Sequence, residues 1–501
     1  MVVIGAGMGG LAAAALLARQ GIDTLVLERA AAPGGKMRQV EVAGRAIDAG
    51  PTVFTMRWVF EALFADCGAR LADAVNLQPA HILARHAWSP SERLDLHADP
   101  ERSAAAIEAF AGPAEARGFR AFCAAAQRTY RTLEGPFIRG ERPSIASLAL
   151  SVRRPADLFA IKPFASLWSE LGTYFRDPRL RQLFGRYATY CGSSPFLAPA
   201  TLMLVADVEQ QGVWFVDGGM HALARALADL AAAAGAELRY GAGVAEISTE
   251  AGRVSGVRLE SGEVVPADAV VANADPQAIA SGRFGRAVQR AVASTKPAER
   301  SLSALTWIGV AEASGFALVR HNVFFSRDYR AEFDALGRGT VPPEPTVYVC
   351  AQDRADDDAG AGPQRLLVLI NAPPTGDTHP LSELETERCR EGAWGLMERC
   401  GLTLRGEPWT TTGPAEFDRL FPATGGALYG PAVHGATASF KRPTSRTAVR
   451  GLYLAGGAVH PGAGVPMAAL SGRLAASALM ADLGSTERSR MTAIAGGMST
   501  R

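Results

Sequence analysis

Three glycines at the start of the chain have the spacing of a phosphate-binding turn. Gly5, Gly7 and Gly10 follow the short apolar run Val2–Ile4 in the pattern G-x-G-x-x-G. The first glycine permits a tight turn, the second lets a pyrophosphate approach the backbone, and the third lets the next helix pack against the strand. The free N–H groups at the start of that helix can hold an anion. The pattern therefore predicts a dinucleotide site.

The residues after these glycines come in the order that such a site requires. The alanine-rich segment Leu11–Gln20 predicts a helix, and Gly21 suits its C-terminal end. A second apolar strand is expected over Ile22–Leu27, and it ends at Glu28. An acidic side chain about 20 residues beyond the glycines can accept hydrogen bonds from ribose hydroxyls. We therefore favour nucleotide binding over a purely structural glycine turn.

The next segment distinguishes between NAD and FAD. Gly34 and Gly35 precede Lys36, and the run Asp-Ala-Gly-Pro-Thr ends shortly afterwards at Pro51 and Thr52. Paired glycines let the chain double back beside a cofactor, and Lys36 places a cation near the diphosphate. A surface turn with a β-hairpin is the alternative explanation. An NAD-binding domain would continue with another helix and strand, so the segment favours FAD.

A strand that ends in glycines lies near the other end of the chain. It covers residues 451–457 and leads into the run HPGAGVP at 460–466, which precedes a small-residue helix over Met467–Met480. With the N-terminal motifs, this run resembles the phytoene-desaturase-type carotenoid desaturases, which share their FAD-binding fold with amine oxidases and protoporphyrinogen oxidase. Further matches are HNVFFS at 321–326, YGPAVH at 429–434 and AVVANAD at 269–275.

The resemblance extends from the first strand to about Asp482. It is greatest to the branch that desaturates 1-hydroxylated acyclic carotenoids at the 3,4 bond in purple phototrophic bacteria. It implies an α/β fold with a Rossmann-like FAD-binding domain of the amine-oxidase and glutathione-reductase type, and an inserted α+β substrate domain. The backbone of Val244 would meet the adenine, and the C-terminal motif would cover the diphosphate and the pyrimidine side of the flavin.

The cofactor residues implied by the motifs and the resemblance are Gly5, Gly7, Gly10, Glu28, Gly34, Gly35, Lys36, Pro51, Thr52, Val244, Gly456, Gly457, Gly464, Val465 and Pro466. One position departs from the wider fold. Many relatives carry Gly-Asp where this chain has Gly456-Gly457-Ala458, so the contact to the ribitol chain must come from elsewhere, for example from backbone N–H groups.

The predicted domain organisation is discontinuous. The FAD-binding domain is expected to comprise residues 1–68, 213–275 and 435–483, the substrate domain residues 69–212 and 276–434, and a flexible tail residues 484–501. Strand candidates in the second insertion are Ala304–Val310, Thr346–Ala351 and Leu366–Asn371. Strands with a helical cap would form a deep apolar pocket over the flavin.

Composition excludes several other functions. The 501 residues carry 51 Lys and Arg against 50 Asp and Glu, so no overall basic field attracts nucleic acid. Six scattered cysteines suit reduced thiols in the cytoplasm, and eight histidines show no ligand spacing, so we expect no metal. The chain also shows neither a signal peptide nor a long apolar run, and we expect no integral membrane segment.

One segment suggests contact with a membrane surface. Residues 153–168 combine three cations with aromatic and aliphatic side chains, among them Phe159, Phe164 and Trp168. Such a segment can anchor a protein to anionic lipid, or it can be an ordinary amphipathic helix of the cap. Because a polyene is insoluble in water, both explanations stay open. The expected location is the cytoplasmic side of a membrane, with peripheral attachment.

No catalytic acid or base stands out in the sequence. Desaturation needs a hydride acceptor, which flavin supplies and side chains cannot, with oxygen or a quinone as the final electron acceptor. His460 is the candidate catalytic residue, although it could instead hold the turn before Pro461. Glu209 and Asp207 are weaker candidates.

A polar partner for a substrate hydroxyl cannot be assigned from the sequence, although His321, Asn322 and Arg57 are possible. Three other activities also remain open on the same fold. The first is phytoene desaturation or carotenoid isomerisation. The second is amine or porphyrinogen oxidation, for which Tyr429 and Trp214 could form an aromatic cage. The third is transport of prenylated partners without FAD, as in Rab GDP-dissociation inhibitors, which the intact glycine motifs disfavour.

Overall fold

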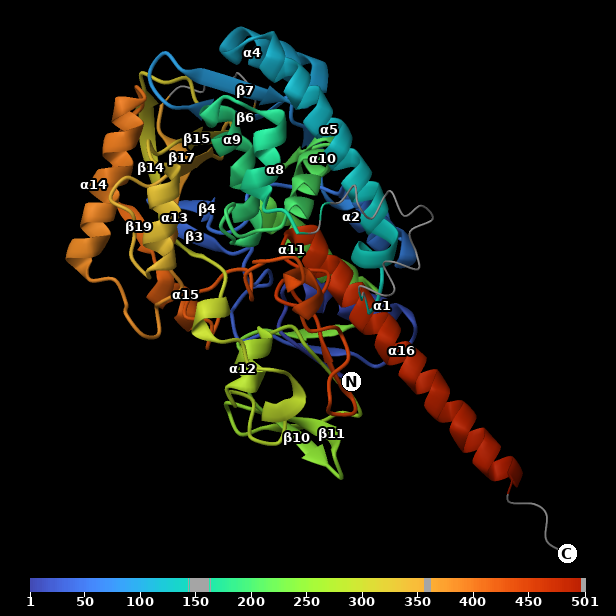
Figure 1. The fold of residues 1–501 in the computed structure, drawn as a ribbon. Coiled ribbons are helices and arrows are strands. Elements are labelled where there is room, and N and C mark those ends of the chain that lie inside the picture. Colours follow the sequence, from blue (N-terminus) through green and yellow to red (C-terminus); the bar gives the residue numbers. More distant parts are fainter. Residues whose placement is uncertain (143, 145–161, 163, 356–361, 497–501) are drawn as a thin grey trace, which may run out of the picture.

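The computed structural model describes residues 1–142, 144, 162, 164–355 and 362–496, without the side chains beyond residue 484 (Figure 1). Its first layer is a five-stranded parallel sheet near the N-terminus. In spatial order, its strands are β20 (Leu452–Leu454), β13 (Val270–Ala272), β1 (Val2–Ile4), β2 (Leu25–Leu27) and β9 (Glu237–Arg239). Their residues are apolar runs because helices cover both faces of a parallel sheet.

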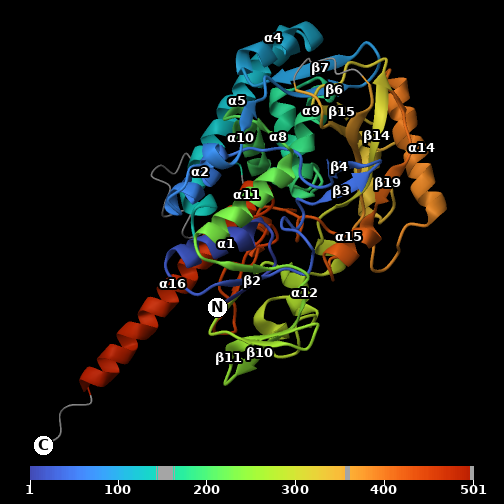
Figure 2. The same ribbon diagram turned by 180° about the vertical axis from the view of Figure 1, so that it is seen from behind.

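Three helices of small residues pack beside this sheet. They are α1 (Met8–Arg19), α11 (Met220–Ala233) and α16 (Val465–Gly496). Figure 2 shows α1 between α11 and α16. A Cβ added at Gly472 of α16 would lie 2.1 Å from the carbonyl oxygen of Gly9 in α1, so glycine is required where these helices cross.

The last helix corrects one expectation about the chain end. Residues 484–496 continue α16 and are helical, although a flexible tail was expected from residue 484. The segment contains no proline, so nothing in its backbone stops the helix before Gly496. In both ribbon views its C-terminal part projects away from the rest of the molecule (Figures 1 and 2).

A second, eight-stranded sheet forms the other half of the molecule. Its spatial order is β18 (Thr403–Arg405), β14 (Ser303–Ser314), β17 (Gln364–Ala372), β16 (Val347–Ala351), β15 (His321–Phe324), β6 (Ile82–Ala87) and β7 (Arg93–His97), and β19 (Trp409–Thr412) pairs with β14. Side chains alternate between its two faces. Leu305, Trp307 and Val349 therefore pack against α14 (Glu383–Arg399), whereas Thr306 and Tyr348 face the interior.

Helices cover the interior-facing side of this sheet and form the upper part of the molecule (Figure 1). They are α4 (Pro100–Ala111), α5 (Pro113–Leu133), α8 (Leu167–Tyr174), α9 (Pro178–Gly185) and α10 (Leu204–Gln210). A cluster of aromatic rings holds them together, with Phe122, Phe175 and Phe184 in stacked, tilted and edge-on pairs at centroid distances of 4.8 to 5.6 Å. These helices are the cap expected from the sequence.

Smaller elements complete the two halves. They are the hairpin β3 (Gln39–Val42) and β4 (Arg45–Asp48), the antiparallel pair β5 (Leu77–Pro79) and β8 (Trp214–Val216), the three-stranded sheet β10 (Val244–Glu250), β11 (Arg253–Leu259) and β12 (Val264–Pro266), and the helices α2 (Arg57–Asp66), α3 (Leu71–Ala74), α12 (Pro276–Ala280), α13 (Tyr329–Gly337) and α15 (Pro414–Leu420).

The strands of the two large sheets fall within the ranges that the sequence assigned to the two domains. The packing differs at the predicted boundary between residues 275 and 276. Ile279, Val288 and Ala291, assigned to the substrate domain, belong to the same buried cluster as Val2 and Ile4 of the parallel sheet. Residues 276–292 therefore pack with the nucleotide-binding half.

Candidate active site

A large cavity runs between the two halves. Its volume is about 1110 Å³, and its wall includes residues of the glycine turn, the interior face of the eight-stranded sheet and α10. A cavity of this size can hold a dinucleotide together with part of an apolar ligand.

The glycine turn forms one end of the cavity with the geometry that its spacing predicted. Gly5 has φ +94°, and a Cβ at Gly10 would lie 2.1 Å from the carbonyl oxygen of Gly5. Gly7 is the N-cap of α1, and neither a side-chain cap nor an acidic residue occupies the first turn. The backbone N–H groups there are thus available to an anion. Asn273, which the sequence analysis did not select, lies where a Cβ of Gly7 would be.

Glu28 lies at the end of β2 and is almost fully buried. Its Oε2 accepts a hydrogen bond from the N–H of Ala6 at 2.7 Å, and its Oε1 accepts one from the N–H of Ala30 at 2.8 Å. The N–H of Ala242 donates to the backbone carbonyl of Glu28, which brings Val244 to the same part of the cavity wall. Each carboxylate oxygen keeps lone pairs for the hydroxyls of a ribose.

The second glycine pair packs directly on the first turn. Gly34 has φ +120° and donates its N–H to the carbonyl of Ala6 at 2.8 Å, and Gly35 has φ +57°. The chain then returns along β3 and β4 to Pro51 and Thr52, which both line the cavity. The paired glycines, Pro51 and Thr52 therefore belong to the same cavity wall as the first glycine turn.

Asp48, which opens the Asp-Ala-Gly-Pro-Thr run, has a structural task. Its Oδ2 accepts a hydrogen bond from the N–H of Met220, the first residue of α11, and its Oδ1 accepts one from Gln39 at 3.0 Å. A carboxylate at this position offsets the unpaired donors of the helix N-terminus. Asp48 therefore fixes the β4 strand against α11 rather than contacting a ligand.

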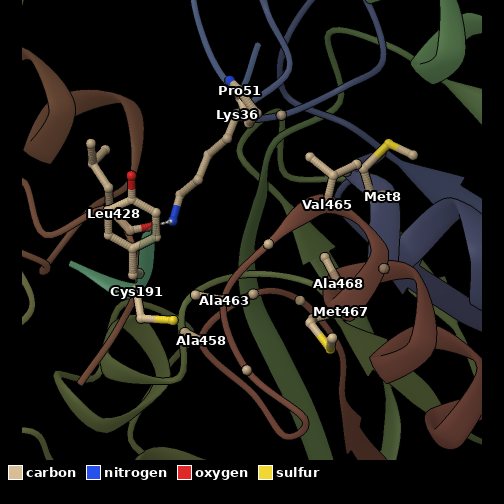
Figure 3. Close-up of a pocket in the computed structure, with 18 of the residues that line it drawn as sticks. Met8, Lys36, Pro51, Cys191, Leu428, Ala458, Ala463, Val465, Met467 and Ala468 are labelled. Carbon is tan, nitrogen blue, oxygen red and sulfur yellow. Dashed lines mark hydrogen bonds between the residues drawn. The ribbon is translucent and has the colours of Figure 1, made fainter. Parts of the chain in front are cut away.

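Lys36 is a cation of the cavity wall. Figure 3 shows its side chain extending from beside Pro51 to the carbonyl of Leu428, to which its ammonium donates. The Nζ atom also lies 5.1 Å from the centroid of the Phe421 ring. Burial lowers the pKa of Lys36, while the carboxylate of Asp275 raises it.

Arg442 is a second buried cation of the wall, and no sequence motif indicated it. Its guanidinium donates to the carbonyls of Tyr429 at 2.9 Å, Pro431 at 2.9 Å and Gly457 at 3.2 Å. Burial lowers its pKa as well. The carboxylate of Asp275 acts on both cations, but neither forms an ion pair with it, and two buried cations facing one carboxylate suit a ligand that carries negative charge. Together with the uncapped helix and Glu28, they fit the diphosphate and ribose of FAD.

All cofactor residues predicted from the sequence line this cavity except Gly10, whose place is behind the turn. The residues in the wall are Gly5, Gly7, Glu28, Gly34, Gly35, Lys36, Pro51, Thr52, Val244, Gly456, Gly457, Gly464, Val465 and Pro466. The C-terminal motif contributes the side opposite Lys36, where Figure 3 shows Val465, Ala463 and Ala458.

His460 is not in the cavity wall. Its ring lies edge-on against Phe137, with centroids 5.1 Å apart, and its Nε2 is 2.8 Å from the carbonyl oxygen of Gly140. The ring lies behind Phe137, which lines the cavity, so the structure does not place His460 in the wall and its catalytic role stays a prediction. The geometry agrees with the alternative, in which His460 holds the turn before Pro461.

The residues considered for a substrate hydroxyl also lie outside the cavity wall. Asn322 is fully buried and bonds to the backbone of Val319 and Val349, and Arg57 pairs with Glu61 at 2.8 Å. His321 lies one hydrogen bond behind the wall, because its Nδ1 contacts the Tyr348 hydroxyl at 2.7 Å.

Tyr348 itself faces the cavity and shares a hydrogen bond of 2.7 Å with Thr52. Of the two aromatic-cage candidates, Tyr429 lines the cavity, whereas Trp214 packs edge-on against Phe54. The wall therefore contains no cage formed by this pair.

The cap contains a buried polar cluster, of which the sequence had indicated only Glu209. Tyr187 and Tyr190 donate hydrogen bonds of 2.8 Å to the two carboxylate oxygens of Glu209. Both tyrosines lie in the 3₁₀ helix Arg186–Cys191, where side chains three residues apart align, so both reach the same carboxylate. Arg186, Tyr190 and Glu209 line the cavity.

The two acidic candidates on α10, Glu209 and Asp207, differ in whether they line the cavity. Glu209 faces the cavity, whereas Asp207 bonds to Gln211 at 2.8 Å and is absent from the wall. Two residues apart on a helix are about 200° apart around its axis, so they cannot share a face.

The fold and the site together define the class of protein. The model of the flavin-containing amine oxidoreductases matches residues 8–480, and the chain belongs to this family. It is an oxidoreductase, and its cofactor is FAD, as the sequence predicted.

Individual relatives narrow the class to the carotenoid desaturases. The chain is 56% identical to the hydroxyneurosporene desaturase of Rubrivivax gelatinosus, over 100% of this chain and 97% of that protein. It is 46% identical to the hydroxyneurosporene desaturase of Cereibacter sphaeroides, over 97% and 99% of the two chains. Identity to the zeta-carotene-forming phytoene desaturase of Myxococcus xanthus is 32%, over 96% and 93%.

A solved structure shares the fold. An oxidoreductase from Methanosarcina mazei superimposes with a TM-score of 0.58 at 18% identity, covering 94% of this chain and 98% of that chain. Among the described helices, none is both long and apolar enough to cross a membrane. The described residues also contain no group of three or more potential metal ligands.

Proposed function

We propose that this protein is an FAD-dependent desaturase that introduces the 3,4 double bond into an acyclic 1-hydroxylated carotenoid, in a phototrophic bacterium. The observation that carries the proposal is the 56% identity, over the full chain, to a hydroxyneurosporene desaturase. The lower identity of 32% to a phytoene desaturase favours the hydroxylated substrate over phytoene.

The cavity suits this reaction. When bound, FAD supplies the acceptor for the hydride. The wall around the cap is aliphatic, with Leu202, Val205 and Val208 facing Leu367 and Leu369 of the eight-stranded sheet. Such a wall aligns a polyene and excludes water from the carbons that lose hydrogen.

The experiment uses the FAD-loaded protein with carotenoids in liposomes. A hydroxylated neurosporene-type polyene should gain one conjugated double bond and absorb at longer wavelength. Conversion of phytoene, with the hydroxylated polyene left unchanged, would assign the protein to the phytoene desaturases instead.

We further propose that the protein works on the cytoplasmic side of a membrane as a peripheral protein, with oxygen or a quinone as electron acceptor. Most of the segment 153–168 lies outside the described residues. Next to it, Phe164 is 92% exposed at the opening of the cavity, and Leu197 is 56% exposed. The two side chains flank an antiparallel β-bridge between Ser166 and Pro199.

An insoluble substrate entering there would come from a lipid surface. Flotation with anionic vesicles tests this, and Phe164→Ser with Leu197→Ser should weaken binding while Leu384→Ser, at an exposed site on α14, should not. Flotation that is equal for all three proteins would refute this surface as the anchor. Anaerobic turnover with and without a quinone distinguishes the acceptors.

A further inference from the structure

The cluster of Arg186, Tyr190 and Glu209 is an unusual feature of an otherwise aliphatic part of the cavity. Arg186 is 8% exposed and Glu209 is 6% exposed, so both charged groups are buried. Their neighbours in the wall are Leu202, Leu204, Val205, Val208 and Val323. Burying charged groups is costly, and a cavity that only held a hydrocarbon would not need them.

The hydrogen-bonding groups of this cluster are only partly paired within the protein. Tyr187 and Tyr190 each occupy one oxygen of the Glu209 carboxylate, and every such oxygen can accept a further hydrogen bond. The guanidinium of Arg186 lies over the Tyr190 ring at 5.0 Å, and its Nε–H has no hydrogen-bond partner. A buried donor without a partner in a cavity wall indicates a ligand that accepts there.

The protonation states suit recognition of a hydroxyl group. Burial raises the pKa of Tyr187 and of Tyr190, so both phenols stay protonated and donate to Glu209. Burial opposes the charge of Arg186, but the facing Tyr190 and Glu209 raise its pKa above the usual value. The cluster therefore offers both donors and acceptors, and a hydroxyl group needs one of each.

We infer that Arg186, Tyr190 and Glu209 bind the 1-hydroxyl of the carotenoid and thereby select the hydroxylated substrate. This inference rests on the proposed function. The hydroxyl donates to the Glu209 carboxylate and accepts from the guanidinium of Arg186, while Tyr190 keeps its own hydrogen bond to Glu209.

The chemistry of the substrate requires this contact to lie close to the flavin. Only one carbon, C2, separates the carbon that carries the hydroxyl from the 3,4 bond. A group that binds the hydroxyl must therefore lie beside the reacting carbons. Arg186 and Tyr190 line the same cavity as Tyr348, which shares a hydrogen bond with Thr52. The charge of Arg186 also helps to lower the pKa of His321, the hydrogen-bond partner of Tyr348. Thr52 belongs to the predicted cofactor wall.

The expected preference for the hydroxylated polyene follows from the polar groups that a substrate without the hydroxyl would leave unpaired. A substrate that lacks the hydroxyl leaves the buried cluster without its partner, which disfavours it by roughly 10- to 100-fold in kcat/KM. Removal of the cluster should abolish that difference. Replacing both charges together avoids leaving one buried charge alone, and apolar replacement of a buried pair is often tolerated.

The test compares two polyenes of equal length, one with the 1-hydroxyl and one without it, on FAD-loaded protein in liposomes. The variants are Arg186→Met with Glu209→Leu, and the milder Tyr190→Phe, which keeps both charges. Asp207→Asn is the matched control, because Asp207 lies on the same helix and is equally buried but is absent from the wall. Binding is measured separately by quenching of flavin fluorescence.

We expect the double variant to lose roughly 10- to 100-fold of the kcat/KM preference and of the binding preference for the hydroxylated polyene, and Tyr190→Phe to lose a smaller part. Asp207→Asn should keep the wild-type ratio. An unchanged ratio in the folded double variant would overturn the inference. Equal losses for both substrates would also overturn it, because the cluster would then serve the reaction or the fold.

Tyr190→Phe keeps the test decisive if the double variant does not fold, because a ratio equal to that of wild type in this variant would also count against the cluster. The wild-type protein decides the proposed function separately. If it converts phytoene and leaves the hydroxylated polyene unchanged, the proposed function fails whatever the variants do.

Discussion

The two ends of the cavity are built in different ways. At the nucleotide end, the wall is mostly backbone: glycines, an uncapped helix N-terminus and the ends of parallel strands. At the cap end, side chains of the 3₁₀ helix and of α10 meet to form the polar cluster around Glu209. Backbone sites depend on the shape of one turn, whereas a side-chain cluster depends on how separate helices pack. The two ends should therefore fail in different ways.

The largest expected effect is at the nucleotide end. Gly7→Val should abolish FAD retention, because a side chain would occupy the space of the pyrophosphate and of Asn273. The FAD content of purified protein is measured by absorbance, with folding checked by circular dichroism. Gly395→Val is the control, because a Cβ at that helical glycine meets open space. A folded Gly7→Val protein with stoichiometric FAD would refute this placement.

The substrate half should instead be sensitive to pH. Burial raises the pKa of Glu332 from 4.5 to about 7, although Ser326 and Thr346 donate to its carboxylate. The folded protein then holds more protons than the unfolded chain between these values, so stability falls as the pH rises through this window. The loss attributable to Glu332 is about 3 kcal/mol.

Glu332→Gln should remove that dependence, because an amide of the same shape does not ionise. Urea denaturation at pH 5 and at pH 8 gives the two free energies of unfolding. The exposed Glu391 on α14 provides the control Glu391→Gln. A pH dependence as steep in Glu332→Gln as in the wild-type protein would contradict the assignment.

A smaller effect is expected where a side chain assists the backbone site. Glu28→Ala should weaken FAD binding by about 1–3 kcal/mol, because charge-assisted hydrogen bonds to the ribose are lost. Glu28→Gln, which keeps the shape and one acceptor oxygen, should lose less. Titration of the apoprotein with FAD measures both dissociation constants. Equal dissociation constants in wild type and Glu28→Ala would remove Glu28 from the site.

The smallest effect is expected at His460. His460→Asn should cost roughly 1 kcal/mol of stability through the hydrogen bond to Gly140, and kcat should change little. Thermal denaturation and steady-state kinetics on the same preparation separate the two effects. A large decrease in kcat at unchanged stability would support a catalytic role for His460.

The sequence by itself determined the nucleotide half and the class of protein. Gly5, Gly7 and Gly10 act through neighbouring backbone atoms, so their spacing contains the geometry of the turn. The buried strands could also be predicted, because short apolar runs such as Val2–Ile4 and Val270–Ala272 are typical of parallel strands that are covered on both faces. The HPGAGVP run identified the family for the same reason, since it is contiguous.

Only the tertiary structure decided which side chains face the cavity. Arg442 and Arg186 belong to none of the motifs, and no local pattern distinguishes them, or Glu209 from Asp207, as residues of the cavity wall. His460 shows the converse, because its motif lines the cavity while its ring points to Gly140. A contiguous motif fixes where the backbone goes, whereas the direction of a side chain depends on the packing of segments that meet only after folding.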